Sequence, residues 1–234
     1  RTLRGEIRVA GPSSIIPAQL DRLGLPRSAY DAVVTSGDAT RAAIESLLPR
    51  PVFKLGPDKD EMLYEGLAVD FAPIERAGFI VCTGLVDDQR ETPADYAEFL
   101  ENGAARNLRM VCANPDIVVR WGDRLVYCAG ALAEVYEKLG GKVVYGGKPH
   151  APIYDLACKR LEDAAGRSLD RRRILAIGDG VKTDIAGAAH NGFPSLYIAG
   201  AGGVHDGAAD EASIALALDS AGVFADCAAA GLAW

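Results

Sequence analysis

Two aspartates beside one short apolar run are the residues of this sequence best placed to do chemistry. Residues 174–177 predict a short buried strand, and Asp179 follows that strand between two glycines. Asp184 comes five positions later, where Thr183 is expected to cap a new helix. Ligands of open α/β sheets gather at the carboxyl ends of the strands, and Mg²⁺ prefers carboxylate oxygens. This stretch therefore predicts a site for a metal and a phosphate at a helix start.

A lysine in a glycine-containing loop is the second candidate. Lys148 follows a predicted strand at residues 143–145, so its side chain is expected at the same sheet edge as Asp179. An ammonium group there can neutralise phosphate oxygens, whereas a solvated surface lysine is the competing interpretation. A P-loop for ATP is excluded, because GxxxxGK needs a glycine where Lys142 stands and a Ser or Thr where Pro149 stands.

Other patterns with chemical potential have simpler explanations. Asp58 and Asp60 form a DxD pair at an expected helix start, where acidic residues are favoured. Asp87 and Asp88 lie in a polar loop; either pair could face a substrate, and neither is placed like a nucleophile. The glycines around Asp179 do not complete the GxGxxG pattern of dinucleotide-binding proteins. The three histidines share no metal-ligand spacing.

The elements that must hold these residues alternate between helix and strand. Strands are predicted at residues 32–34, 52–55, 79–82, 108–112, 143–145, 174–177 and 195–198. Thr92 is expected to cap a helix with Pro93 at its first position and Asp95 at its third. Residues 117–119 and 125–127 are predicted to be the two strands of a hairpin with its turn at residues 121–124. The alanines at 228–230 predict a surface helix. The alternation favours an α/β fold with a parallel sheet.

Composition narrows the class of protein. The chain has 234 residues, is 49% hydrophobic and has a net charge of -7, with scattered basic residues, so nucleic acid is not an expected partner. Five cysteines without a CxxC pair indicate neither a disulfide framework nor a thiolate zinc site, and they fit a cytoplasmic location. No apolar run is long enough to span a membrane, and no signal peptide is visible at the start.

Three motifs together resemble one known family. They are GKPHAPIY at residues 147–154, GDGVKTDIAGAAHNG at 178–192 and CANPD at 112–116. Their combination resembles the haloacid dehalogenase (HAD) superfamily, class IIA, the NagD-like phosphatases, and the lysine and paired-acid motifs match in order and spacing. The resemblance covers about residues 12 to 203. It implies an α/β fold with a Rossmann-like parallel-sheet core, expected at residues 1–55 and 144–234, and an inserted α/β cap domain at 56–143.

The resemblance also implies roles for particular residues. Asp179 and Asp184 would hold Mg²⁺, and Lys148 would stabilise the nucleophile and the transferring phosphoryl group. The substrate would be bound by cap and loop residues: Asn114, Asp116 and Gly180. The chemistry implied is hydrolysis of a phosphate monoester through an aspartyl-phosphate intermediate.

The first part of the family's site has no counterpart in this sequence. The family's nucleophile lies in a DxD motif at the end of the first strand, and no such strand occurs before Pro12. Positions 8–11, where a second motif with Thr or Ser and Asn is expected, read Arg-Val-Ala-Gly. Residues 1–11 are therefore interpreted as fragments joined across gaps, with the true first strand missing. The nucleophile is left unassigned.

The sequence thus predicts an Mg²⁺-dependent phosphatase acting on a small phosphorylated metabolite, such as a sugar phosphate or a nucleotide monophosphate. Two alternatives stay open. A catalytically inactive HAD-like binding or scaffold protein would explain the missing DxD motif, and a phosphotransfer receiver domain would also use an acidic Mg²⁺ cluster. The insertion of about ninety residues argues against the receiver, because receivers are compact. Substrate identity and oligomeric state are undetermined, with a homodimer as one option.

Overall fold

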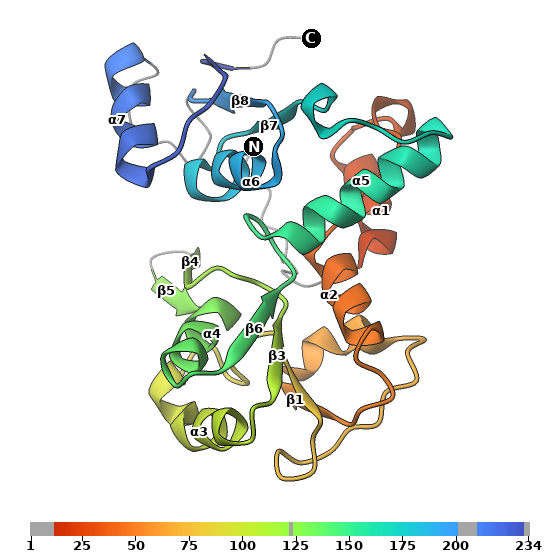
Figure 1. Ribbon diagram of the computed structural model, residues 1–234, viewed down its shortest axis with the longest axis vertical. Coiled ribbons are helices and arrows are strands. Elements are labelled where there is room, and N and C mark those ends of the chain that lie inside the picture. Colours follow the sequence, from red (N-terminus) through yellow and green to blue (C-terminus); the bar gives the residue numbers. More distant parts are fainter. Residues whose placement is uncertain (1–11, 122–123, 201–209, 232–234) are drawn as a thin grey trace. The chain divides into compact units, whose positions relative to one another are not determined.

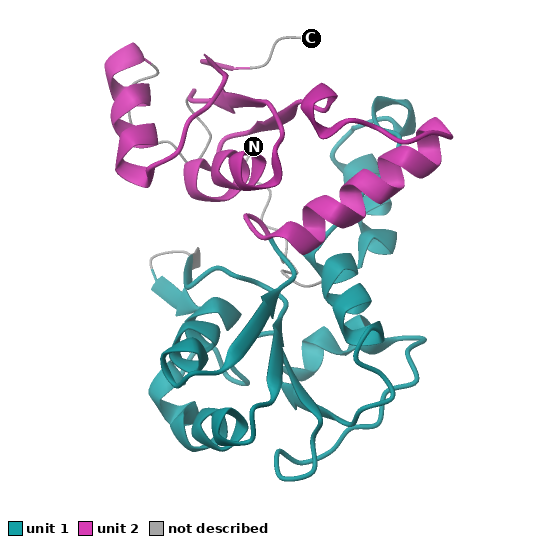
Figure 2. Cartoon of the chain, in the orientation of Figure 1, with its two compact units in different colours: residues 1–147 teal, residues 148–234 magenta. Residues whose placement is uncertain are grey.

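The computed structural model describes residues 12–121, 124–200 and 210–231 (Figure 1). The chain divides into two compact units, residues 1–147 and residues 148–234 (Figure 2). The motif expected at positions 8–11 and the hairpin tip at 122–123 lie outside the described residues. Within the described ranges, no helix has both the length and the apolar character needed to cross a membrane.

The first unit is built on a four-stranded parallel sheet with the order β1-β2-β3-β6. Its strands are β1 (Val52–Leu55), β2 (Phe79–Cys82), β3 (Arg109–Cys112) and β6 (Lys142–Tyr145). In the register of the sheet, Phe79 lies beside Val52 on one side and Arg109 on the other. Strand β2 is buried along its whole length, as expected for a parallel strand with both faces covered. The carboxyl ends of all four strands therefore meet at one edge.

Helices cover both faces of this sheet. Successive side chains of a strand point to opposite faces, so neighbouring residues of one strand pack against different helices. On one face, Ile80 belongs to an apolar cluster with Leu100 and Tyr136. On the other face, Val81 belongs to a cluster with Ile44. The helices that supply these residues are α2 (Ser36–Glu45), α3 (Ala97–Ala105) and α4 (Ala129–Lys138). Together the two clusters form the core of the unit.

Short elements complete the first unit. They are the helix α1 (Ile16–Arg22), the 3-10 turns η1 (Ser13–Ile15), η2 (Arg27–Ala29), η3 (Asp58–Tyr64) and η4 (Pro93–Tyr96), and the antiparallel hairpin of β4 (Val118–Trp121) and β5 (Arg124–Tyr127). The predicted cap at Thr92 is confirmed, since Asp95 Oδ2 accepts the Thr92 N–H at 2.7 Å. Thr35 forms a similar capping box with Asp38 at the start of α2.

Helix α4 begins directly against the backbone that follows β3. The Gly130 N–H donates to the Asp116 carbonyl at 3.1 Å. A Cβ at position 130 would lie 2.1 Å from the Pro115 carbonyl oxygen, which is a backbone atom that cannot rotate away. Gly130→Ala is therefore expected to lower the free energy of unfolding by about 2 kcal/mol. Urea denaturation of the variant and the wild type measures this difference.

The matched control for this substitution is Gly231→Ala, because a Cβ at position 231 meets no atom within 4 Å. We expect the control to unfold at the urea midpoint of the wild type. A Gly130→Ala protein as stable as the control would contradict the close approach of α4 to the loop after β3.

The second unit contains a three-stranded parallel sheet with the order β7-β8-β9. Its strands are β7 (Ala176–Gly178), β8 (Ser195–Ile198) and β9 (Cys227–Ala229), and its helical elements are α5 (Ala151–Ala165), η5 (Arg171–Arg173), η6 (Val181–Ile185), α6 (Ala186–Asn191) and α7 (Glu211–Ala221). Element η6 is a single π-helical turn that leads into α6. Ile185 and Tyr197 are fully buried in the core of this unit.

Two predicted elements are wrong. Residues 32–34 are not in a strand; they form an irregular segment that leads to Thr35, the N-cap of α2. Residues 228–230 were expected to be helical, but Ala228 and Ala229 belong to β9, which pairs in parallel with β8. The backbone of β8 offers hydrogen bonds to this segment, and this tertiary pairing outweighs the intrinsic helix preference of alanine.

The boundary between the two compact units differs from the predicted boundaries between core and cap. The predicted boundaries at 55/56 and 143/144 separate β1 from β2 and cut through β6. In the structure β1, β2, β3 and β6 share one sheet, and the division between compact units falls at 147/148. The inserted cap at residues 56–143 stays a prediction.

Candidate active site

The acidic loop of the second unit is shaped by hydrogen bonds around Gly180. Asp179 and Gly180 follow β7, and the π-helical turn η6 carries Asp184 back toward the start of the loop. The Asp184 N–H donates to the Gly180 carbonyl at 2.7 Å, and Asp184 Oδ2 accepts the Gly180 N–H at 3.0 Å. These reciprocal bonds fix the carboxylate of Asp184 beside the end of β7.

Glycine is required at the end of β7 for steric reasons. A Cβ at Gly178 would lie 2.3 Å from the Cβ of Asp184 and 2.6 Å from its Oδ2. A Cβ at Gly180 would lie 2.1 Å from the hydroxyl oxygen of Thr183. The two glycines thus let the turn fold closely against the strand, and no larger residue fits without moving Asp184.

Lys148 is brought to this loop from 36 positions earlier in the chain. Its ammonium group forms a hydrogen-bonded ion pair with Asp184 Oδ1. The Lys148 side chain is 47% exposed, whereas that of Asp184 is 15% exposed. The lysine is therefore open to a ligand from solvent, while the carboxylate that holds it is mostly covered by protein.

Asp179 lies close enough to the strand β8 to influence a buried tyrosine. Gly178 and Tyr197 are register partners in the sheet, so Asp179 directly follows the residue beside Tyr197. Burial raises the pKa of Tyr197, and the negative charge of Asp179 raises it further. Burial also raises the pKa of Tyr154 to about 12, with the charge of Asp184 as the second cause. Each aspartate therefore lies within electrostatic reach of a tyrosine hydroxyl in this unit.

The loop fits part of a magnesium site. Asp179 and Asp184 supply carboxylate oxygens, and Mg²⁺ commonly takes one or two carboxylates and completes its shell with water and substrate phosphate. Among the residues that the structure describes, no group of three or more His, Cys, Asp or Glu side chains is arranged to hold a metal. Both oxygens of Asp184 already accept protein donors, but each oxygen has a second lone pair for a cation.

Thr183 does not have the predicted capping role. It lies inside the π-helical turn, and its hydroxyl donates to the Gly180 carbonyl at 3.5 Å. Helix α6 has six residues and begins only at Ala186, after the turn. The predicted helix start at Asp184 is therefore displaced, because the chain first makes a wider turn that returns Asp184 to Gly180 and Lys148.

Asn114 and Asp116, predicted to bind substrate, follow β3 in the first unit, whereas Lys148, Asp179 and Asp184 belong to the second. Asn114 is 5% exposed, and its side-chain oxygen accepts the Asp116 N–H at 3.2 Å. This is the bond of an Asx turn, so Asn114 shapes the loop. Asp116 is exposed at the carboxyl edge of the four-stranded sheet.

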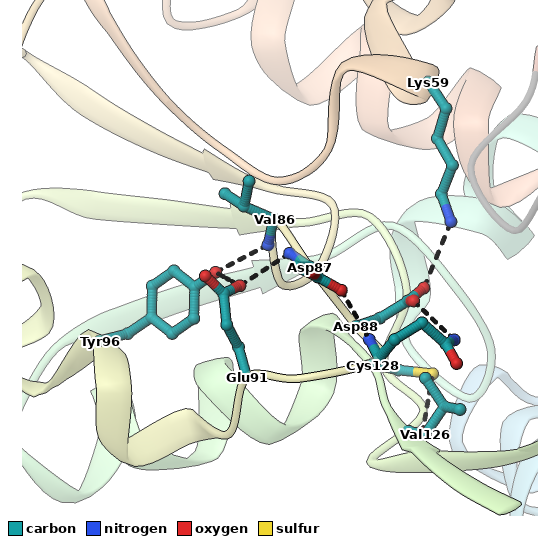
Figure 3. Close-up of polar contacts among 9 residues, drawn as sticks. Lys59, Val86, Asp87, Asp88, Glu91, Tyr96, Val126 and Cys128 are labelled. Carbon is teal, nitrogen blue, oxygen red and sulfur yellow. Dashed lines mark hydrogen bonds and ion pairs between the residues drawn. The ribbon is translucent and has the colours of Figure 1, made fainter.

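The loop after β2 reaches the same edge and is held by polar contacts (Figure 3). Glu91 accepts hydrogen bonds from the Asp87 N–H at 2.7 Å and from the hydroxyl of Tyr96 at 2.5 Å. Asp88 forms an ion pair with Lys59 at 3.3 Å, which links the loops after β1 and β2. The polar loop expected at Asp87 and Asp88 is thus an ordered part of the sheet edge.

Lys59 is a residue of this edge that sequence reasoning missed. Burial raises the pKa of the Cys128 thiol to about 11; the charges of Asp116 and Asp88 raise it and that of Lys59 lowers it. The three charged groups therefore lie around one buried thiol. The sequence contained a signal for Lys59, because this residue follows the strand β1 just as Asp116 follows β3, and the carboxyl ends of parallel strands share one edge.

The fold and site first define a class: an α/β protein whose second unit joins a lysine and a carboxylate at a loop that follows a parallel strand. A profile of the HAD-hydrolase-like family matches residues 145–224, which include Lys148, Asp179 and Asp184. A crystal structure of a haloacid dehalogenase-like family hydrolase from Brucella suis 1330 is 49% identical, with a TM-score of 0.72 over 85% of this chain and 75% of that chain. This chain belongs to the haloacid dehalogenase-like family.

More distant structures share the fold. A p-nitrophenyl phosphatase from Archaeoglobus fulgidus is 19% identical, with a TM-score of 0.70 over 94% of this chain and 79% of that chain. A glycerol phosphate phosphatase from Mycobacterium tuberculosis in complex with calcium is 23% identical, with a TM-score of 0.57 over 82% of this chain and 55% of that chain. No curated protein matches. The predicted superfamily and the α/β fold with a parallel sheet are confirmed.

Proposed function

We propose that this chain is an Mg²⁺-dependent phosphatase that hydrolyses a small phosphorylated metabolite. The observation that carries the proposal is the ion pair between Lys148 and Asp184, in the same unit as Asp179 and inside the segment that matches the HAD-hydrolase-like profile. Phosphatases are among the proteins of similar fold, which supports this reaction class. Sugar phosphates and nucleotide monophosphates are the proposed substrate classes.

The proposed mechanism assigns each residue one task. Asp179 and Asp184 would hold Mg²⁺, which when bound would neutralise charge on the phosphate. Lys148 would contact the non-bridging phosphate oxygens, where negative charge is concentrated during phosphoryl transfer. Its ion pair with Asp184 keeps the ammonium group at the loop before substrate arrives, so little reorganisation is needed. Gly180 would place its backbone near the phosphate.

The proposed route passes through an aspartyl-phosphate, and no aspartate of the described residues is assigned as the nucleophile. Asp116 is proposed to contact the leaving group. Asn114 is proposed to support this contact through the turn that it stabilises. A cytoplasmic setting is part of the proposal, because the five thiols form no disulfide. Neither nucleic acid nor a membrane is a proposed partner, and a homodimer stays a prediction.

The test is turnover of p-nitrophenyl phosphate by the purified chain with Mg²⁺, then with excess EDTA, followed by a panel of phosphorylated metabolites. We expect release of inorganic phosphate that requires the metal. Binding of a phosphorylated ligand without turnover, measured by calorimetry, would instead support the non-enzymatic alternative. Stable phosphorylation of the chain by acetyl phosphate, without release of phosphate, would support the receiver.

A further inference from the structure

The end of helix α6 carries a buried asparagine that reaches the lysine loop. Asn191 is 9% exposed and is the last residue of α6. Its side-chain amide donates to the Gly187 carbonyl at 2.8 Å and to the Pro149 carbonyl at 3.4 Å. A buried amide group needs partners for its donors, and both of these partners are backbone carbonyls. Asn191 therefore connects α6 to the residue that directly follows Lys148.

This connection is separate from the ion pair between Lys148 and Asp184. Lys148 contacts Asp184 through its side chain, and Asp184 leads through η6 into α6. Asn191 returns from the other end of α6 to Pro149. The lysine loop is thus attached to the acidic segment at two places, one through the Lys148 ammonium and one through the neighbouring carbonyl. With both attachments the Lys148 backbone has little freedom to move away from Asp184.

The backbone of Asn191 is itself fixed. Its carbonyl accepts a hydrogen bond from Arg171 at 3.3 Å. Arg171 also pairs with Asp155 of α5 and lies 5.4 Å from the ring centroid of Phe193. One guanidinium group therefore holds the end of α6 against α5, the helix that begins immediately after the lysine loop.

A tyrosine of α5 supports the same arrangement. The Tyr154 hydroxyl donates to the Thr183 carbonyl at 3.4 Å, next to Asp184. A Cβ at Gly187 would lie 2.0 Å from that hydroxyl oxygen, so α6 has a glycine where the tyrosine crosses it. The ring of Tyr154 also packs on Phe193, with centroids 5.6 Å apart. Helices α5 and α6 thus meet closely next to the acidic turn.

We propose that Asn191 is a positioning residue that holds Lys148 at Asp184 through the Pro149 carbonyl. The inference rests on the proposed phosphatase function for its kinetic consequence, but the placement of Lys148 can be measured without turnover. Asn191 is buried among backbone groups, so it acts through the lysine rather than by touching substrate. The substitution that tests it is Asn191→Leu, which keeps the branched shape of the side chain and removes both hydrogen-bond donors.

The kinetic test is a double-mutant cycle between Asn191→Leu and Lys148→Ala. With Lys148 present, Asn191→Leu is expected to lower kcat about tenfold with little change in KM, because a misplaced catalytic group weakens the transition state more than substrate binding. In the Lys148→Ala background the same substitution should change kcat by less than about twofold. Equal losses in both backgrounds would overturn the inference.

Leu218→Ala is the control for general destabilisation. Leu218 packs on the core of the second unit and belongs to α7, away from the lysine loop in sequence. We expect Leu218→Ala to lower the melting temperature and to change kcat by the same factor whether or not Lys148 is present. A cycle for Asn191 that looks like this control would assign Asn191 a structural role only.

Acetic anhydride labelling, quantified by peptide mass spectrometry, reports on Lys148 without any substrate. Asn191→Leu is expected to raise the labelling rate of Lys148 several-fold, while the exposed references Lys142 and Lys159 keep their rates. An unchanged rate at Lys148 would overturn the inference even if the chain is an active phosphatase. Raised labelling in a chain without turnover would support the inference and reject the proposed function.

Discussion

Replacing Asp179 with asparagine is expected to lower Mg²⁺-dependent turnover by about a thousandfold while the fold survives. The amide has nearly the shape of the carboxylate, so the loop after β7 can keep its course. It lacks the negative charge that a hard cation requires, and a neutral oxygen is a much weaker ligand for Mg²⁺. The measurement is p-nitrophenyl phosphate turnover over a range of Mg²⁺ concentrations, with circular dichroism to confirm folding.

Asp163→Asn is the matched control, because Asp163 is an exposed aspartate of α5 in the same unit. It makes the same change in net charge without touching the acidic loop. We expect it to retain wild-type turnover and the wild-type Mg²⁺ requirement. Full activity of Asp179→Asn would remove Asp179 from the site and leave Asp184 as the only proposed ligand of the metal.

Replacing Lys148 with alanine is expected to lower kcat by a factor of about 10² to 10³. The Lys148 side chain is about half exposed and its ammonium group is already held by Asp184, so it can contact phosphate oxygens as charge develops on them. Loss of a preorganised charge affects the transition state more than the bound substrate, and kcat should fall more than KM rises. Steady-state kinetics at saturating Mg²⁺ measure both parameters.

Lys159→Ala is the control for this substitution, since Lys159 is an exposed lysine of α5. Lys148→Arg adds a second comparison, because a guanidinium group keeps the charge but presents its donors in a fixed plane. We expect partial activity from the arginine variant and full activity from Lys159→Ala. If Lys148→Ala behaved like Lys159→Ala, Lys148 would be a solvated surface lysine, which is the competing interpretation of the sequence.

Much of the fold follows from local patterns in the sequence. Strands at residues 52–55 and 79–82 were predicted with the observed bounds, because their short apolar runs end at Gly or Pro signals. The helix start at Thr92 was predicted because Pro93 and Asp95 stand at positions that suit a helix N-terminus. Asp179 was placed at the end of a strand for the same reason. Such signals depend on neighbours in the sequence, so one chain is enough to find them.

The incorrect predictions arose where a distant segment decides the structure. Residues 32–34 have the composition of a strand, but no strand within the described residues pairs with them, and the segment instead leads into α2. Ala228 and Ala229 have the composition of a helix, but β8 offers them an edge to pair with. Propensity is a weak preference, and hydrogen bonds from another strand outweigh it.

The sequence by itself determined the chemical groups of this protein: two aspartates five positions apart after a strand, and a lysine in an earlier loop. Only the tertiary structure decided that Lys148 meets Asp184 across 36 positions, and that Asn191 ties the lysine loop to α6. It also decided that β1 and β6 share a sheet with β2 and β3. The physical reason is that residue types and their spacing fix local conformation, whereas contacts between distant segments depend on how the elements pack together.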